Sequence, residues 1–202
     1  YVNLYESSGC SGPIAAVTGR PTETCLVAYE DSNSATATGS YMFTCYGDQS
    51  MTEAFTDTEC KVPVGSTTNS LGCRNTVGRF RSAEGKCTSD DSRLPLPASN
   101  FTTEIIYDSR TTCDANIVQF ESFESDHCFN NGGNSALKYE YPTVLYYTSS
   151  TCAAAPASNA TLPTTCTTVT VPTTTNNLAY KWTYGDVNFG GSSSKTLTDA
   201  EI

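Results

Sequence analysis

The chain has 202 residues, a formal net charge of −10 at pH 7 and a pI of about 4.4, with 16% of its residues charged. This acidic balance argues against nucleic acid partners and anionic lipid surfaces, since both need clustered Lys and Arg, and no apolar run is long enough for membrane insertion. The 32 Thr and 23 Ser residues instead indicate β-structure that faces water through hydroxyl groups.

The first predicted element is an amino-terminal strand, Tyr1-Val2-Asn3-Leu4-Tyr5, which precedes the first cysteine. No apolar signal-peptide segment opens the sequence, so we expect that a secreted precursor would already have lost its signal peptide. Terminal segments fray unless they pair with something. We therefore predict that Tyr1, Val2, Leu4 and Tyr5 belong to a strand that pairs either with its own module or with a neighbouring copy.

A short repeat then runs along the chain, in which a cysteine follows an aromatic residue by five or six positions. Its four copies occupy residues 5–10, 55–60, 107–113 and 147–152. Each of these cysteines is followed by another after 13 to 15 positions. The pattern predicts four stapled loops, each entered by a strand that ends in an aromatic anchor.

The ten cysteines are even in number and widely spaced, and His127 is the only histidine. Such usage favours disulfides in an oxidising, extracellular compartment, whereas a zinc site needs close cysteine pairs. The loop pattern predicts the pairs Cys10 with Cys25, Cys60 with Cys73, Cys113 with Cys128, Cys152 with Cys166, and Cys45 with Cys87. A rival scheme joins Cys45 to Cys60 and Cys73 to Cys87, and its spacings are equally regular.

The middle of the chain carries a linker signal, the polar and proline-containing stretch at residues 89–100. The cysteine pattern also repeats on either side of it, from Cys10 to Cys73 and from Cys113 to Cys166. We therefore predict a first β module at residues 1–95, a linker at 96–100, and a second β module at 101–202 that includes a carboxy-terminal strand segment.

The second half shows the clearest strand patterns. Residues 138–141, 167–171 and 178–184 alternate with period two, and residues 117–120 and 143–147 are β-branched or aromatic runs of strand length. No window sustains a helical period. The predicted fold is all-β, with two tandem disulfide-stapled β-sandwich-like modules.

The last predicted strand, which contains Leu178, Tyr180, Trp182 and Tyr184, lies beyond the cysteine framework. An unpaired edge this aromatic would invite association. Either it folds back onto its own module, or it completes the sheet of a neighbouring copy and generates a filament. Trp182 between its two tyrosines could also form a sugar platform, although core packing is the more common role.

The tandem Y-x-S-x-x-C…C segments quoted above resemble a class of secreted, cysteine-rich proteins from protists and algae. Some of these resemble subunits of glycan-coated extracellular fibrils from aquatic microbes. The resemblance implies a surface or filament role with self as the partner, and it carries over no catalytic residues. Cys45 and Cys87 depart from the pattern, because they have no counterpart in the second half.

Catalytic and metal-binding motifs are hard to find, and we predict neither an enzyme nor a cofactor. His127 lies in a loop segment beside Cys128, where a surface or packing role is the common one. Carboxylates for glycoside hydrolysis exist among Glu121, Glu124, Asp126, Asp90 and Asp91, and oxygen ligands for calcium exist at residues 31–34 and 89–92. Acidic residues on a net-negative surface are usually solvated, and neither oxygen-rich stretch has the spacing of a known calcium loop.

Two N-x-[ST] sequons, at Asn100 and Asn159, predict covalent glycans, and Thr-rich stretches at residues 164–168 and 173–175 are candidates for O-linked sugars. We therefore predict an extracellular structural subunit of a glycosylated fibril or cell-surface coat that assembles through inter-subunit β contacts. The alternative is a secreted carbohydrate-binding module such as a lectin or adhesin.

Overall fold

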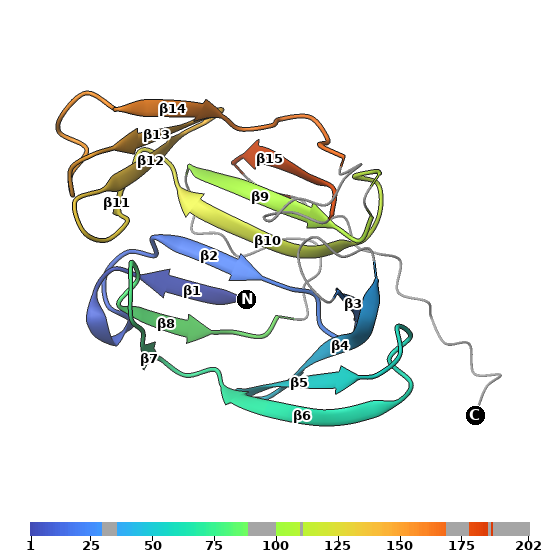
Figure 1. Cartoon of the computed structure of the whole chain (residues 1–202). Helices are drawn as coiled ribbons and strands as arrows, with labels where there is room; N and C mark the ends of the chain where they lie inside the picture. Colours follow the sequence, from blue (N-terminus) through green and yellow to red (C-terminus); the bar gives the residue numbers. More distant parts are fainter. Residues whose placement is uncertain (30–35, 89–99, 110, 169–177, 186, 188–202) are drawn as a thin grey trace.

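The computed structural model describes residues 1–29, 36–88, 100–109, 111–168, 178–185 and 187, and these residues form three antiparallel sheets (Figure 1). The strands of the first half are β1 (Val2–Tyr5), β2 (Ala16–Gly19), β3 (Cys25–Tyr29), β4 (Ala37–Tyr46), β5 (Gln49–Phe55), β6 (Pro63–Ser70), β7 (Arg74–Asn75) and β8 (Ser82–Gly85). Those of the second half are β9 (Phe101–Tyr107), β10 (Ile117–Glu124), β11 (Cys128–Asn130), β12 (Ala136–Glu140), β13 (Thr143–Tyr147), β14 (Ser158–Thr161) and β15 (Tyr180–Tyr184). The described helical structure is one 3-10 turn, Ser8–Cys10, so the predicted all-β, disulfide-stapled, β-sandwich-like fold is confirmed.

The central sheet has seven strands in the order β15-β9-β10-β2-β1-β8-β7, and it takes strands from both halves of the chain. The halves meet where β2 pairs with β10, with Thr18 opposite Glu121 and Val17 opposite Ser122. This ladder makes the backbone hydrogen bonding continuous across the central sheet, from the first half of the chain to the second.

Each half adds a four-stranded meander to this sheet. The first has the order β3-β4-β5-β6 and the second β11-β12-β13-β14, and the two lie at opposite ends of the molecule (Figure 1). The last strands of the meanders, β6 and β14, are their outer edges.

The two halves repeat one topology. In each, a hairpin enters the central sheet (β1-β2 and β9-β10), a four-stranded meander follows, and a return strand (β8 and β15) pairs with the first strand of the hairpin. The central order is therefore symmetric about the β2–β10 ladder, apart from the additional short strand β7.

The largest described hydrophobic cluster lies between the central sheet and the second meander. Phe129 is completely buried and makes edge contacts with Phe80, Phe123 and Tyr139. Tyr139 in turn stacks on Trp182, with ring centroids 5.8 Å apart. Because Phe80 belongs to the first half, this core also joins the two halves.

All ten cysteines form disulfides, but four of the five predicted pairs are wrong. The observed pairs are Cys10–Cys73, Cys25–Cys60, Cys45–Cys87, Cys113–Cys166 and Cys128–Cys152. Only the prediction for Cys45 and Cys87 is confirmed, and the rival scheme is wrong as well. In each half, an outer disulfide encloses an inner one.

Pairing between distant strands explains the nested arrangement. Cys25 begins β3, and Cys60 lies in the loop after β5, where its backbone N–H donates to Ser40 Oγ of β4 at 3.2 Å. Since β4 lies between β3 and β5, it brings these two cysteines together across the meander. The outer disulfide, Cys10–Cys73, has a similar origin. Strand β8 pairs with β1 close to Cys10, and β7, which begins just after Cys73, pairs with β8.

The predicted aromatic anchors are confirmed in all four copies of the repeat. Strands β1, β5, β9 and β13 each end at the aromatic residue that precedes a cysteine, and all four side chains are buried: Tyr5, Phe55, Tyr107 and Tyr147. Each strand therefore ends where a large ring enters the interior, a few residues before a disulfide-bonded cysteine. The four separate stapled loops that the repeat predicted do not form, because the cysteines pair in the nested way described above.

Candidate functional site

Both predicted assembly strands lie within the sheet of their own chain. Strand β1, with Tyr1, Val2, Leu4 and Tyr5 in or beside it, has β2 on one side and β8 on the other. Both of its edges are therefore occupied, which is the fold-back alternative to strand exchange. Neither edge of β1 is open to pairing with a further strand.

The carboxy-terminal strand β15 pairs with β9, and its outer edge is partly covered. Tyr180 exchanges two backbone hydrogen bonds with Thr167, and the Trp182 N–H donates to the Pro163 carbonyl at 2.7 Å. Trp182 is buried in the core with Tyr180 packed against that core, whereas Tyr184 is exposed and stacks on Tyr141. A sugar platform centred on Trp182 is therefore closed off.

The longest described strand with every residue exposed is β6, which has eight residues. One of its edges pairs with β5, and no strand in the described part of the chain pairs with the other. Val64 on this strand and Val62 just before it are 65% and 54% exposed. The strand carries no charged side chain, so it lacks the lysines that usually protect an edge from pairing.

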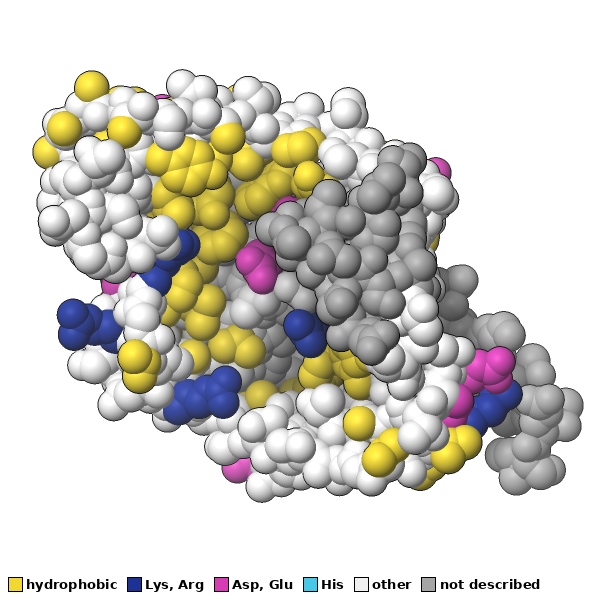
Figure 2. Space-filling model, in the orientation of Figure 1, with side chains coloured by type: hydrophobic (Ala, Val, Ile, Leu, Met, Phe, Trp, Pro, Cys, Tyr) yellow, Lys and Arg dark blue, Asp and Glu magenta, His cyan; other side chains and the backbone are white. Residues whose placement is uncertain are grey.

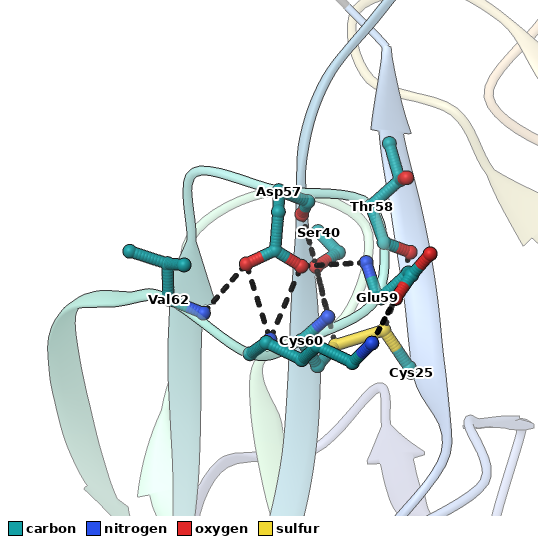
Figure 3. Close-up of polar contacts among 8 residues, drawn as sticks. Cys25, Ser40, Asp57, Thr58, Glu59, Cys60 and Val62 are labelled. Carbon is teal, nitrogen blue, oxygen red and sulfur yellow. Dashed lines mark hydrogen bonds and ion pairs between the residues drawn. A yellow bond between two sulfur atoms is a disulfide. The ribbon is translucent and has the colours of Figure 1, made fainter.

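A tight loop fixes the start of this edge (Figure 3). The Asp57 carboxylate accepts hydrogen bonds from the backbone N–H groups of Glu59, Lys61 and Val62, at 2.7, 3.1 and 2.5 Å. These bonds hold the pKa of Asp57 below its usual value. Ser40 Oγ of β4 donates to the Asp57 carbonyl at 2.6 Å. This hydrogen bond and the Cys25–Cys60 disulfide attach the loop to β4 and β3.

The matching edge in the second half is β14, whose four residues are also exposed and uncharged. It pairs with β13 along one edge, and the sequon residue Asn159 lies opposite Leu145. Side chains project from the faces of a sheet, so a glycan on Asn159 leaves the edge groups of β14 accessible. Asn100 is exposed as well, just before β9.

Charge is distributed unevenly around these edges. Residues 60–83, which include β6, contain four cationic side chains and no acidic one, within a chain of net charge −10. Residues 141–185, which include β14, contain one cationic side chain, Lys181, and no acidic one. Copies of an acidic chain repel one another least where acidic groups are absent.

A pair of glutamates lies at the centre of the molecule. Glu104 of β9 is directly opposite Glu121 of β10, and Trp182 and Thr18 continue the same row on the flanking strands. Burial, and secondarily the charge of Glu121, raise the pKa of Glu104 to about 7. The face of the molecule drawn in Figure 2 is hollowed, and acidic and basic side chains lie among hydrophobic ones there.

His127 joins the two halves of the chain. Its Nε2 atom lies 2.9 Å from Glu6 Oε2, and its Nδ1 atom lies 3.5 Å from Glu124 Oε2. Its ring packs edge-on against Phe129. The preceding residue, Asp126, is exposed, and its Oδ1 atom lies 3.6 Å from Lys138 Nζ. Glu121 therefore lies apart from Glu124 and Asp126, next to Glu104.

Several predicted features lie outside the described residues: the oxygen-rich stretch at 31–34, Asp90 and Asp91, most of the linker, and the Thr-rich stretch at 173–175. Within the described part, no group of three or more His, Cys, Asp or Glu side chains is arranged to hold a metal ion, and no helix there is long and apolar enough to cross a membrane. The exposed candidates for O-linked sugars are Thr164, Thr165 and Thr168.

Comparisons with protein-family models, curated proteins and solved structures gave no match for this chain.

Two features escaped the sequence analysis. Strand β6 has the sequence PVGSTTNS, with neither alternation nor a hydrophobic run, so its strand character had no signal. Glu104 was not singled out among the other acidic residues. The signal that could have identified the edge is the absence of Asp and Glu between residues 60 and 83.

Proposed function

We propose that this chain is a structural subunit of an extracellular, glycosylated fibril or cell-surface coat. Its partner is another copy of itself, and covalent glycans cover the outer faces. This role requires a stable protein with a large exposed surface, and it requires no catalytic step.

The observation that carries the proposal is the pair of exposed, uncharged edge strands, β6 and β14, at opposite ends of a disulfide-stapled molecule. Unpaired edges are templates for another chain, and natural proteins usually protect them with charge, proline, bulges or cover. In β6 such features are confined to the start of the strand, where Pro63 and a register shift against β5 occur. Keeping two such edges open favours a protein whose role is to assemble. The five disulfides fit an oxidising, extracellular environment.

The resemblance of the aromatic-to-cysteine repeat to secreted, coat-forming proteins points the same way, and the exposed sequons Asn100 and Asn159 provide places for glycans. The buried position of Trp182 removes the aromatic platform on which the lectin alternative rested.

The test is the state of the secreted, glycosylated full chain. Electron microscopy and sedimentation velocity at increasing protein concentration should show filaments or sheets built from one repeating subunit. A chain that stays monomeric at all concentrations and ionic strengths, and in its native material, would disprove the structural role.

A further inference from the structure

We propose that copies of the chain join head to tail, with β6 of one copy pairing with β14 of the next. The inference rests on the proposed structural role and specifies its contact. Such a pairing would join the meander β3-β4-β5-β6 of one copy to the meander β14-β13-β12-β11 of the next, as one eight-stranded sheet.

The main-chain groups of the two edges supply the attraction. Both strands end their meanders, both are exposed at every residue, and neither has a second partner among the described strands. Each therefore offers a row of N–H and C=O groups, which in β6 is interrupted at its start by Pro63 and the register shift beside it, and which another edge satisfies directly. Side chains give little steric obstruction, since β14 contributes only Ser, Asn, Ala and Thr.

The other described edges are less suitable. Strand β7 has two residues and β11 has three, β15 is bridged by Thr167, and residues 25–28 of the edge strand β3 are buried or half-buried. The hydrogen bond from the Leu71 N–H to the Asp48 carbonyl and the Asp57 loop hold the two ends of β6, so this long edge is already ordered before it binds. Ordering in advance lowers the entropic cost of association.

Charge does not oppose a contact between β6 and β14. Neither strand carries a charged side chain, and Lys61, just before β6, pairs with Glu59. The arginines that follow β6 lie elsewhere: Arg74 is on β7, and Arg79 contacts Asn131 in the second half. The two edges can therefore approach without bringing like charges together.

The geometry has a consequence for growth. A β6-to-β14 contact uses different surfaces on the two partners, so each added copy exposes a fresh β6 at one end and a fresh β14 at the other. Unless the rotation per copy closes a ring, the product is an open filament. A contact of β6 with β6 would instead end at a symmetric dimer, unless β14 also paired with β14.

Three variants of the full chain test the contact. Thr67→Lys places a charge in the middle of β6, and Ala160→Lys does the same on β14 while preserving the Asn159 sequon. The matched control is Val77→Lys, because Val77 is fully exposed and lies in no strand. Unchanged thermal unfolding and an absence of free thiols establish that each variant is folded.

Head-to-tail assembly predicts a specific result in sedimentation velocity. Each edge variant alone remains monomeric, but an equal mixture of the two forms heterodimers, since each keeps the edge that the other lacks. Val77→Lys forms filaments like the unmodified chain, and either edge variant shortens wild-type filaments by capping one end. Val64→Lys, a second substitution on β6, behaves like Thr67→Lys.

Other outcomes would overturn the contact. If either edge variant alone forms filaments, or if each alone forms dimers, the head-to-tail pairing is wrong, although a structural role persists. If the unmodified chain never assembles, both the contact and the proposed function are wrong.

Discussion

Replacing Glu104 with Gln should stabilise the protein above pH 7. Glu104 lies opposite Glu121 in the central sheet, and its pKa is about 7 in the folded state against an ordinary value of 4.5. The folded state therefore holds this proton more tightly than the unfolded state. Because the unfolded chain releases the proton first as the pH rises, folding stability falls between about pH 4.5 and 7 and is level above that range.

The difference between the two pKa values corresponds to a loss of about 3 kcal/mol in the free energy of unfolding once Glu104 is ionised in both states. Glutamine keeps the shape of the side chain without its charge, so Glu104→Gln should remove this loss. Glu121→Gln should recover only a smaller part, because the charge of Glu121 is the lesser of the two causes.

The assay is urea unfolding at intervals from pH 5 to pH 8, with disulfides intact, for the unmodified chain and both variants. The titratable groups that are not substituted are the same in all three proteins, and their contributions cancel in the difference. The free-energy gap between Glu104→Gln and the unmodified chain should widen with rising pH. Parallel curves across the range would refute the reasoning.

Three further predictions concern the edge, the surface and the core. Asp57→Asn should increase hydrogen exchange of the β6 amides, because the variant lacks the carboxylate that holds the loop. Lowering the pH through the depressed pKa of Asp57 should have the same effect, because protonation removes the charge of that carboxylate. Equal exchange in the variant and the unmodified chain would contradict this prediction. The native intact mass should exceed 21.6 kDa by N-linked glycans at Asn100 and Asn159, each removed by Asn→Gln; a bare mass would exclude them. Phe129→Ala should lower the free energy of unfolding by about 3–5 kcal/mol in denaturant titration, because the fully buried ring contacts both halves. The control is Tyr146→Ala, which should have a much smaller effect because Tyr146 is exposed.

The sequence predicted the features that local chemistry determines. The aromatic anchors Tyr5, Phe55, Tyr107 and Tyr147 were identified from their spacing to the next cysteine, and each does end a strand with its ring buried. Alternation and β-branched runs likewise predicted much of β10, β12, β13 and β15. These signals involve only residues within one strand and the turn beside it.

The disulfide pairs could not be predicted in this way, because they depend on which strands pair. Loop length favours the nearest cysteine, but β4 lies between Cys25 and Cys60 and brings them together across 35 residues. The raised pKa of Glu104 has the same origin: its burial and its neighbour Glu121 both come from the β9–β10 ladder. A single sequence carries no direct record of such long-range pairing.

The last prediction concerns the two halves expressed separately. Although they repeat one topology and each keeps its own nested disulfides, the β2–β10 ladder and the Phe129 core belong to both. Residues 1–88 alone would leave β2 as an unpaired edge, with Ala16 and Val17, now buried, along it. Removing the second half would also remove Phe129 and Phe123, the rings that share the hydrophobic core with Phe80.

We therefore expect residues 1–88 and 100–202 each to give aggregated or poorly folded material, recognised by broad NMR amide signals and rapid proteolysis. Co-expression of the two halves should restore a single compact species, since the β2–β10 ladder can re-form between them. If either half alone is a monomer with sharp, dispersed amide signals, the shared sheet is not needed for folding, and the duplicated topology reflects two independent domains. A chain that folds only as a whole would instead make the ladder between the halves the contact on which the rest of the molecule depends.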